Sequence, residues 1–246
     1  MVLERLRAEG ERRPVVFGAV VTCAWVAMTI ALAELPPHPF WGPVYVNGIG
    51  FLVGLGVVGL LGWTRAAGLG QLRGGPLMIL PLLLFATEAW PGLGSSADEV
   101  VILLCVALNE EIWSRGVILT ALRGLGPYRC ATLVAVLFGL QHLINLRWGQ
   151  SFDDTAVQIV EAGGFGFMLA ALRMRGVSIW WLIVAHAFAD YLSIMSPGAA
   201  PWWQQAAEVL LEIGYGGWLL RRGTAASRPA VIAEEPQDRE ADSPRR

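Results

Sequence analysis

The chain has 246 residues, of which 55% are hydrophobic and 15% are charged. Soluble domains usually carry about a quarter charged residues, so this composition favours a membrane protein. The formal net charge of -2 excludes a strongly basic nucleic-acid-binding surface, and the three cysteines show no C-x-x-C spacing typical of zinc or redox sites.

Long apolar runs predict an all-α polytopic protein with about eight transmembrane helices, because about 20 apolar residues span a bilayer. In chain order we place them at 15–35, 43–63, 76–91, 98–123, 128–147, 155–173, 176–196 and 202–220. The third is short and contains Pro81, so we expect it to be kinked or tilted. The first resembles a secretory signal, but its apolar run of about 20 residues favours a retained helix.

The arginines support this topology, because basic residues near helix ends mark the cytoplasmic side. Arginines precede the first predicted helix and follow the second, fourth, sixth and eighth, whereas the other loops are acidic and contain only Arg147. Both termini are therefore expected in the cytoplasm. We divide the chain into a cytoplasmic segment (1–14), a transmembrane domain (15–222) and a disordered cytoplasmic tail (223–246), which is too poor in large apolar residues to form a core.

The fourth predicted helix carries three charged residues between two apolar runs. Each charge costs about 2.5 to 3.5 kcal/mol at the centre of a transmembrane helix. Glu111 and Arg115 are four residues apart and can form an ion pair on one helix face, whereas Glu110 points about 100° away from Glu111. Alternatively, this segment is a loop between two half-helices, or the ion pair is purely structural.

Two histidines lie inside other predicted helices. His142 belongs to the fifth and His186 to the seventh, where Asp190 follows His186 by four residues on the same helix face. Counting the helical rise from the arginine-bearing ends places Glu110, His142 and His186 at similar depths. Ionisable residues at such depths indicate a functional site, which we place in a cavity between helices four, five and seven.

These side chains suit hydrolysis of an amide. A carboxylate and a histidine can activate a water molecule, and a second histidine with a polar neighbour can stabilise an oxyanion. The sequence has no G-x-S-x-G motif for a serine nucleophile. No cofactor is expected. Zinc is the alternative, because two histidines and a glutamate are a known ligand set, although the H-E-x-x-H spacing is absent.

Three motifs within 98–195 resemble the CAAX-protease and bacteriocin-processing family of intramembrane glutamic endopeptidases, related to the Ras-converting CAAX endopeptidase. The family's Glu-Glu-x-x-x-Arg is similar to Glu110 to Arg115, its Phe-x-x-x-His to Phe138 to His142, and its His-x-x-x-Asn/Asp to His186 to Asp190. The resemblance implies a CAAX-type peptide hydrolase in which three motifs meet in one site.

The resemblance also implies a role for each matched residue. Glu110 and His142 would activate the water, His186 and Asp190 would form the oxyanion site, and Glu111, Arg115 and Phe138 would support the site. The best-described relatives carry asparagine at the position of Asp190. An ionised aspartate cannot donate to an oxyanion, so Asp190 must be protonated or must act by orienting His186.

We therefore expect an integral protein of a bacterial plasma membrane that hydrolyses a membrane-associated protein or peptide, with the lipid bilayer as its other partner and no nucleic acid. Besides a zinc-dependent membrane protease, two alternatives from other classes remain. Intramembrane Glu, His and Asp also serve as relays in proton-coupled transporters, although the sequence shows no internal repeat. A catalytically silent scaffold or immunity protein would tolerate replacement of Glu110 and His142.

Overall fold

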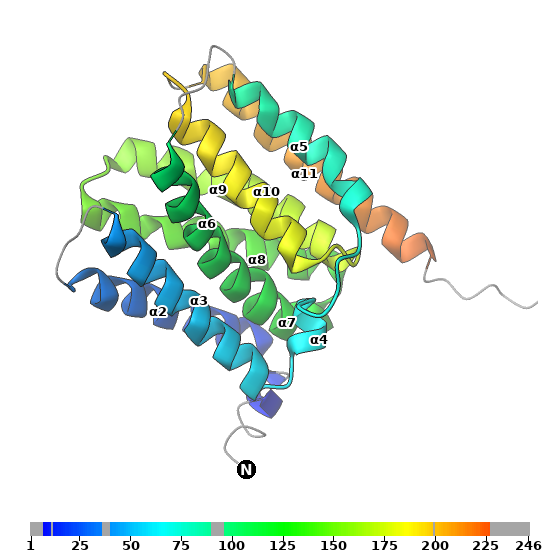
Figure 1. Cartoon of the computed structure of the whole chain (residues 1–246). Helices are drawn as coiled ribbons and strands as arrows, with labels where there is room; N and C mark the ends of the chain where they lie inside the picture. Colours follow the sequence, from blue (N-terminus) through cyan, green and yellow to red (C-terminus); the bar gives the residue numbers. More distant parts are fainter. Residues whose placement is uncertain (1–6, 11, 36–39, 90–95, 199, 227–246) are drawn as a thin grey trace, which may run out of the picture.

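The computed structural model describes residues 7–10, 12–35, 40–89, 96–198 and 200–226. Within these ranges the chain is mostly helical and contains no β-strand. The long helices lie roughly alongside one another in one bundle (Figure 1). The all-α class predicted from the sequence is therefore confirmed.

The α-helices, in chain order, are α2 (Pro14–Ala33), α3 (Trp41–Leu60), α4 (Thr64–Ala67), α5 (Ile79–Phe85), α6 (Ala97–Glu111), α7 (Leu119–Leu122), α8 (Pro127–Gln141), α9 (Phe152–Met174), α10 (Ile179–Met195) and α11 (Trp202–Ala226). Short 3-10 segments lie at Gly75–Met78, Ala86–Ala89, Arg123–Leu125 and His142–Trp148, and a π-helical segment, Ile112–Ile118, joins α6 to α7.

Each of the eight segments predicted to cross the membrane is mostly helical in its described residues. Four helical segments in the described chain are long and apolar enough to cross a membrane, namely Pro14–Ala33, Trp41–Leu60, Pro127–Trp148 and Phe152–Met174. Two shorter apolar helices, Gly75–Phe85 and Ile179–Met195, accompany them. The structure thus supports four candidate spans, and the crossings by the other helices stay a prediction.

Two of the predicted helices are neither candidate spans nor among the shorter apolar helices. The run from α6 to α7 is divided by the π-helical segment and carries charged residues in its middle. Helix α11 begins with polar residues interspersed among its apolar ones and ends at Ala226, six residues beyond the predicted helix end at 220. The remainder of the predicted tail, 227–246, lies outside the described residues.

Local sequence signals fix where the helices begin. The Ser96 side chain caps α6 by accepting a hydrogen bond from the Glu99 backbone N–H at 3.2 Å, in an S-x-x-E arrangement typical of helix N-termini. Ser151 caps α9 in the same way through the Asp154 N–H at 3.1 Å. Helix α8 starts with Pro127, whose fixed φ suits the first turn. These caps set the register of the helices that carry the polar residues.

Close packing of α8 against α9 depends on glycine. A Cβ atom added at Gly139 would lie 2.6 Å from the Ile159 carbonyl oxygen, and one added at Gly166 would lie 3.1 Å from the Phe138 ring. Gly166 belongs to the small-residue spacing at 162, 166 and 170, which predicts close approach of helix backbones. The structure confirms that packing role, and it brings the Phe138 turn of α8 against α9.

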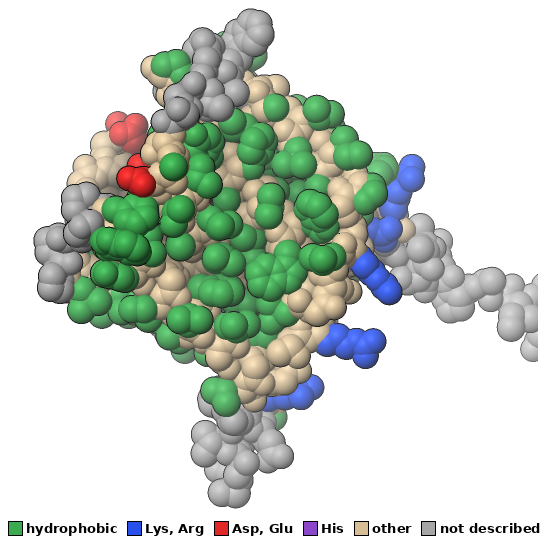
Figure 2. All heavy atoms as spheres, viewed as in Figure 1, with side chains coloured by type: hydrophobic (Ala, Val, Ile, Leu, Met, Phe, Trp, Pro, Cys, Tyr) green, Lys and Arg blue, Asp and Glu red, His purple; other side chains and the backbone are tan. Residues whose placement is uncertain are grey.

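Large apolar side chains also cover the outside of the bundle. Figure 2 shows a broad hydrophobic face with Lys/Arg side chains gathered along one edge and acidic side chains near the opposite edge. Exposed apolar side chains include Val20, Leu52, Leu83, Val136 and Val160. A contiguous apolar surface of this kind is expected where lipid replaces water as the solvent.

Candidate active site

The two adjacent glutamates at the end of α6 face different surroundings. The Glu111 side chain is fully buried, whereas 15% of the Glu110 side chain is exposed. The π-helical segment starts at Ile112, directly after this pair. Such π-helical segments occur frequently at functional sites. The predicted divergence of Glu110 and Glu111 is present, and the alternative of a loop between two half-helices is wrong.

Glu111 joins α6 to α10 through one carboxylate oxygen. Its Oε1 lies 2.7 Å from Arg115 NH1 and 2.9 Å from His186 Nδ1. A carboxylate only accepts hydrogen bonds, so both nitrogens donate to it. Arg115 NH2 reaches the Gly166 carbonyl oxygen at 3.4 Å and thereby contacts α9. The predicted Glu111–Arg115 ion pair is confirmed, and it also holds a histidine of the predicted site.

Phe138 lies at the centre of this cluster. The Arg115 guanidinium carbon is 4.3 Å from the centre of its ring, and the rings of His142 and His186 approach it edge-on with centroid distances of 5.3 Å and 5.9 Å. A cation over an aromatic face is favourable, more so away from water. Phe138 therefore packs against the ion pair on one side and against both histidines.

Hydrogen bonding fixes which His142 nitrogen is available for chemistry. His142 Nδ1 lies 3.1 Å from the Phe138 carbonyl oxygen. Since a carbonyl only accepts, Nδ1 carries the proton, and in the neutral ring Nε2 then bears the lone pair. The 3-10 segment that follows α8 begins at His142, so the histidine sits where the helix geometry changes.

His186 Nε2 faces two further carboxylates. It lies 3.8 Å from Glu110 Oε2 and 3.5 Å from Asp190 Oδ2. The imidazole is thus surrounded by Glu110, Glu111 and Asp190, and 5% of its side chain is exposed. The structure brings Glu110, His186 and Asp190 into one cluster.

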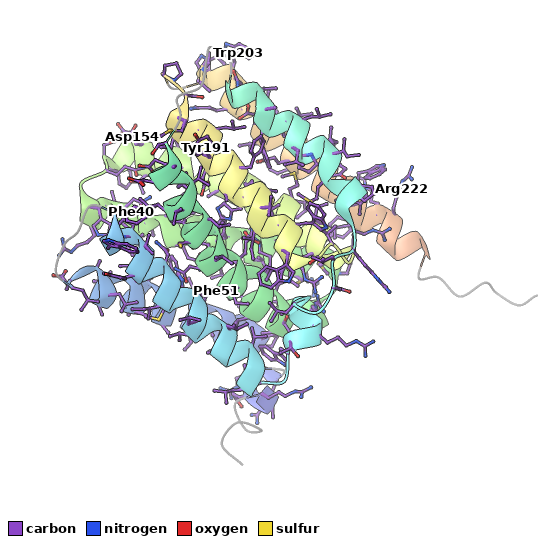
Figure 3. All side chains as sticks on the ribbon, in the orientation of Figure 1. Phe40, Phe51, Asp154, Tyr191, Trp203 and Arg222 are labelled. Carbon is purple, nitrogen blue, oxygen red and sulfur yellow. The ribbon has the colours of Figure 1, made fainter. Side chains whose placement is uncertain are left out.

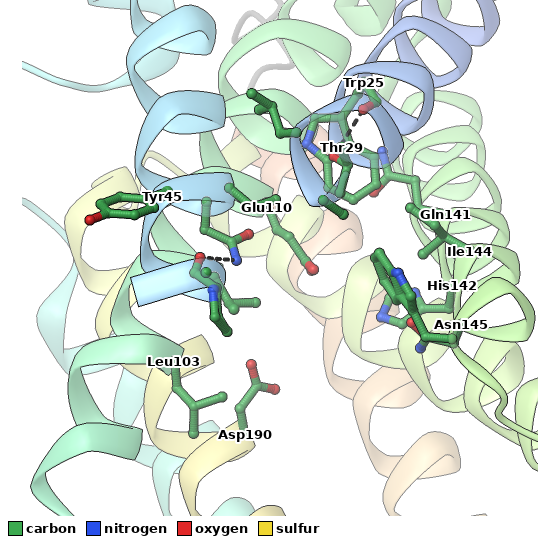
Figure 4. A pocket seen from close by; sticks show the side chains of 18 of the residues that line it. Trp25, Thr29, Tyr45, Leu103, Glu110, Gln141, His142, Ile144, Asn145 and Asp190 are labelled. Atoms are coloured by element: carbon green, nitrogen blue, oxygen red, sulfur yellow. Dashed lines mark hydrogen bonds between the residues drawn. The ribbon is translucent and has the colours of Figure 1, made fainter. Parts of the chain in front are cut away.

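These residues line a cavity of about 790 Å³ together with His142. Figure 4 shows Glu110 and Asp190 on one side of the space and His142 on the other. Most of the remaining wall is apolar and comes from α2, α3, α6 and the segment after α8, with Trp25, Leu32, Leu103, Ile144 and Trp148 among its members. A second cavity, of about 560 Å³, also adjoins His142, His186 and Asp190 and is lined by Glu161, Glu208 and Glu212.

Some polar residues beside the site were not predicted. Asn109 is fully buried; its side chain accepts a hydrogen bond from Trp25 Nε1 at 3.2 Å and donates one to Asn47 Oδ1 at 3.0 Å. This chain of contacts links α2, α3 and α6 directly beside Glu110. Gln141, the neighbour of His142, lines the cavity, and neither of its amide atoms has a hydrogen-bond partner within the described chain. The feature of the sequence that could have identified Gln141 is its position next to an intramembrane histidine.

A zinc ion at this site would need suitable side-chain ligands. Structural and catalytic zinc sites need at least three protein ligands at short distances. In the part of the chain that the structure describes, no group of three or more His, Cys, Asp and Glu side chains is arranged to hold a metal ion.

The match to known families covers the elements just described. Residues 94–192 match the family Type II CAAX prenyl endopeptidase Rce1-like. This region runs from the residues just before α6 into α10 and contains every predicted site residue. The resemblance predicted from the three motifs is therefore confirmed.

The Rce1-like match implies a protease, and thus a hydrolase with a peptide or protein substrate. The apolar helices fit a transmembrane protein, and the Rce1-like match covers residues 94–192 of the 246. No curated protein and no solved structure showed significant similarity to the chain.

Proposed function

We propose that this protein is an intramembrane glutamic endopeptidase that cleaves a membrane-associated protein or peptide with a water molecule activated by Glu110 and His142. The observation that carries the proposal is the convergence of Glu110, His142, His186 and Asp190 on one cavity, within the Rce1-like region. Four ionisable side chains at a membrane-embedded cavity are costly, which favours a catalytic role over a purely structural one.

In the proposed reaction, the Glu110 carboxylate and the His142 Nε2 lone pair hold the attacking water. The water oxygen bonds to the carbonyl carbon of the substrate while Glu110 accepts its proton, and the carbonyl oxygen becomes an oxyanion. Glu110 then gives this proton to the amide nitrogen, the C–N bond breaks, and a carboxylic acid and an amine leave. General acid–base catalysis of this kind contributes about 10² to 10⁴ in rate.

The oxyanion requires hydrogen-bond donors. His186 Nδ1 already donates to Glu111, so donation from Nε2 requires a doubly protonated, cationic ring. Glu110 and Glu111 face that ring and balance its charge. We propose that Asp190 carries a proton and provides the second donor, because two ionised carboxylates close to the same nitrogen would repel each other.

The test compares the membrane proteomes of cells expressing the wild type, Glu110→Gln and His142→Ala, with and without a zinc chelator. Asp98→Asn is the matched control, because it removes an exposed carboxylate from the first turn of the same helix. We expect both site variants to accumulate the same uncut substrate, with no effect of the control or of the chelator. Chelation that reproduces the variants would replace this mechanism with zinc catalysis, and no accumulation under any condition would contradict a protease.

A further inference from the structure

One end of the helix bundle carries the arginines. Arg173 donates hydrogen bonds to the Ala66 and Ala67 carbonyl oxygens at 2.6 Å and 3.1 Å, and the Ser178 N–H donates to the Arg73 carbonyl at 2.9 Å. The connections between α3 and α5 and between α9 and α10 therefore meet at this end. Arg222 on α11 also points out there (Figure 3). We call it the arginine end.

The opposite end, here the acidic end, carries carboxylates. Asp98 and Glu99 lie in the first turn of α6, and Asp153 and Asp154 lie in the first turn of α9. Figure 3 shows Asp154 at this end together with Phe40, Tyr191 and Trp203, away from Arg222. Arg147, the arginine that departs from the alternating pattern, lies 3.0 Å from Glu34, so its charge is balanced locally.

The cavity around Glu110 lies in the half of the bundle next to the acidic end. The wall residues come from the middle of the helices and from the parts of the helices nearest that end. Helix α2 contributes Trp25 and residues between 29 and 33, from its second half, and α3 contributes residues 42–47, at its start. Helix α9 contributes Gln158, near its start, and α10 contributes residues between 186 and 194, near its end. The second cavity lies mostly in the same half, with α11 contributing residues between 205 and 212, although Phe165 of α9 lies deeper.

Aromatic side chains mark the level at which this end meets water. The exposed aromatic residues at the acidic end are Trp41, Tyr45, Trp148, Phe152, Trp202 and Trp203. Tryptophan and tyrosine concentrate at membrane–water interfaces, where their rings lie at the level of the headgroups. Tyr45 and Trp148 are also wall residues of the cavity. The cavity therefore reaches from the Glu110 cluster to the interface at the acidic end.

Because arginine-rich helix ends face the cytoplasm, the acidic end faces the opposite side of the membrane. We propose that the site admits its substrate from the extracytoplasmic side, and that the substrate is an apolar peptide segment of a membrane-anchored chain presented there. This inference rests on the proposed function for the cleavage itself. It distinguishes the protein from an enzyme that trims prenylated C-termini in the cytosol, because such substrates would meet the arginine end.

The side of access can be measured without any cleavage assay. In the background protein, Cys23 and Cys105 are replaced by alanine and buried Cys130 is retained. This protein without a further cysteine is the negative control for labelling. Ser193→Cys places a thiol at an exposed position that lines both cavities. Asp153→Cys reports the acidic end, and Gly124→Cys, where an added Cβ meets no atom within 4 Å, reports the arginine end. A membrane-impermeant maleimide is applied to spheroplasts and to inside-out vesicles.

We expect Ser193→Cys and Asp153→Cys to react in spheroplasts and Gly124→Cys to react only in inside-out vesicles. Reversed labelling of Asp153→Cys and Gly124→Cys would overturn the inference, because it would show that the acidic end faces the cytoplasm. Labelling of Ser193→Cys from the side of Gly124→Cys, or from neither side, would also overturn it, because the cavity would then not open to the extracytoplasmic side. None of these outcomes depends on proteolysis, so failure of the inference and failure of the proposed function are distinguishable.

The cleavage position in the substrate provides a second test of the inference. Where Glu110→Gln accumulates an uncut protein, the new N-terminus produced by the wild type gives the cleavage position. We expect that position in a segment exposed to, or embedded near, the extracytoplasmic face. Cleavage close to the C-terminus of a cytosolic prenylated protein would overturn the inference while supporting the protease.

Discussion

Glu111 Oε1 lies 2.9 Å from His186 Nδ1, and this contact determines which imidazole nitrogen faces the cavity. With Nδ1 donating to the buried carboxylate, Nε2 is directed towards Glu110 and Asp190. The same carboxylate oxygen pairs with Arg115 at 2.7 Å. Glu111 therefore acts through His186 and Arg115 and is a positioning residue, whereas Glu110 faces the cavity.

The two adjacent glutamates should respond differently to the same isosteric change. Glu110→Gln removes the proposed base while keeping its shape, so we expect activity to fall by about 10² to 10⁴ with little change in the melting temperature in detergent. Glu111→Gln leaves the buried Arg115 without its counter-charge, so we expect a loss of stability together with the loss of activity. Equal melting temperatures for the two variants would contradict this division of roles.

The ion pair itself is testable with a double variant. Removing one partner of a buried pair typically costs about 3 to 5 kcal/mol, whereas replacing both with apolar residues is often neutral. We expect Glu111→Leu and Arg115→Met each to lower the melting temperature, and the double variant to recover much of the loss. The recovered protein should stay inactive, because His186 Nδ1 has lost its acceptor. An active double variant would show that Glu111 does not orient His186.

The helical segments and the pairing of Glu111 with Arg115 could be predicted from sequence, because both follow from local periodicity. Apolar runs of membrane-spanning length give the helices, and a spacing of four residues gives the ion pair. The π-helical segment at Ile112–Ile118 could not be predicted this way. It contains no proline, and its only glycine is Gly116, so its irregularity follows from tertiary contacts of its neighbours.

The meeting of His142, His186 and Glu110 was inferred from depth alone, since helix rise gives a height in the membrane but no direction around the bundle. The contact of Glu111 with His186 needed the three-dimensional packing of α6 against α10. The same holds for Asn109, whose partners Trp25 and Asn47 lie 84 and 62 residues away in the chain. Long-range side-chain pairs of this kind leave no spacing signal in one sequence.

Variants of Asp190 distinguish hydrogen-bond donation to the oxyanion from orientation of His186. If its protonated carboxyl donates to the oxyanion, the amide of Asp190→Asn can donate in its place, so we expect activity within about tenfold of the wild type. Asp190→Ala removes the donor, and loss of one oxyanion donor costs about 10² to 10³ in rate. Both variants are compared on the accumulated substrate at equal protein levels. Equal, large losses would indicate instead that the negative charge of Asp190 orients His186.

Gly50 on α3 tests whether the Asn109 network positions Glu110. A Cβ atom at Gly50 would overlap the Asn109 carboxamide, whereas one at Gly48, two residues earlier on the same helix, meets no atom within 4 Å. Alanine in a helix is about 0.5 to 1 kcal/mol more favourable than glycine, so Gly48→Ala should be neutral or slightly stabilising. Gly50→Ala must displace Asn109 from Trp25 and Asn47, and we expect activity to fall by about tenfold or more, since small misplacements of a catalytic group are costly.

Combining Gly50→Ala with Asn109→Ala separates steric overlap from lost positioning. The smaller side chain at 109 removes the overlap, so the melting temperature should return towards that of the wild type. The hydrogen bonds to Trp25 and Asn47 are still missing, so the activity should stay low. Recovery of both stability and activity would mean that the network only fills space beside Glu110, whereas recovery of stability alone would establish Asn109 as a positioning residue for the base.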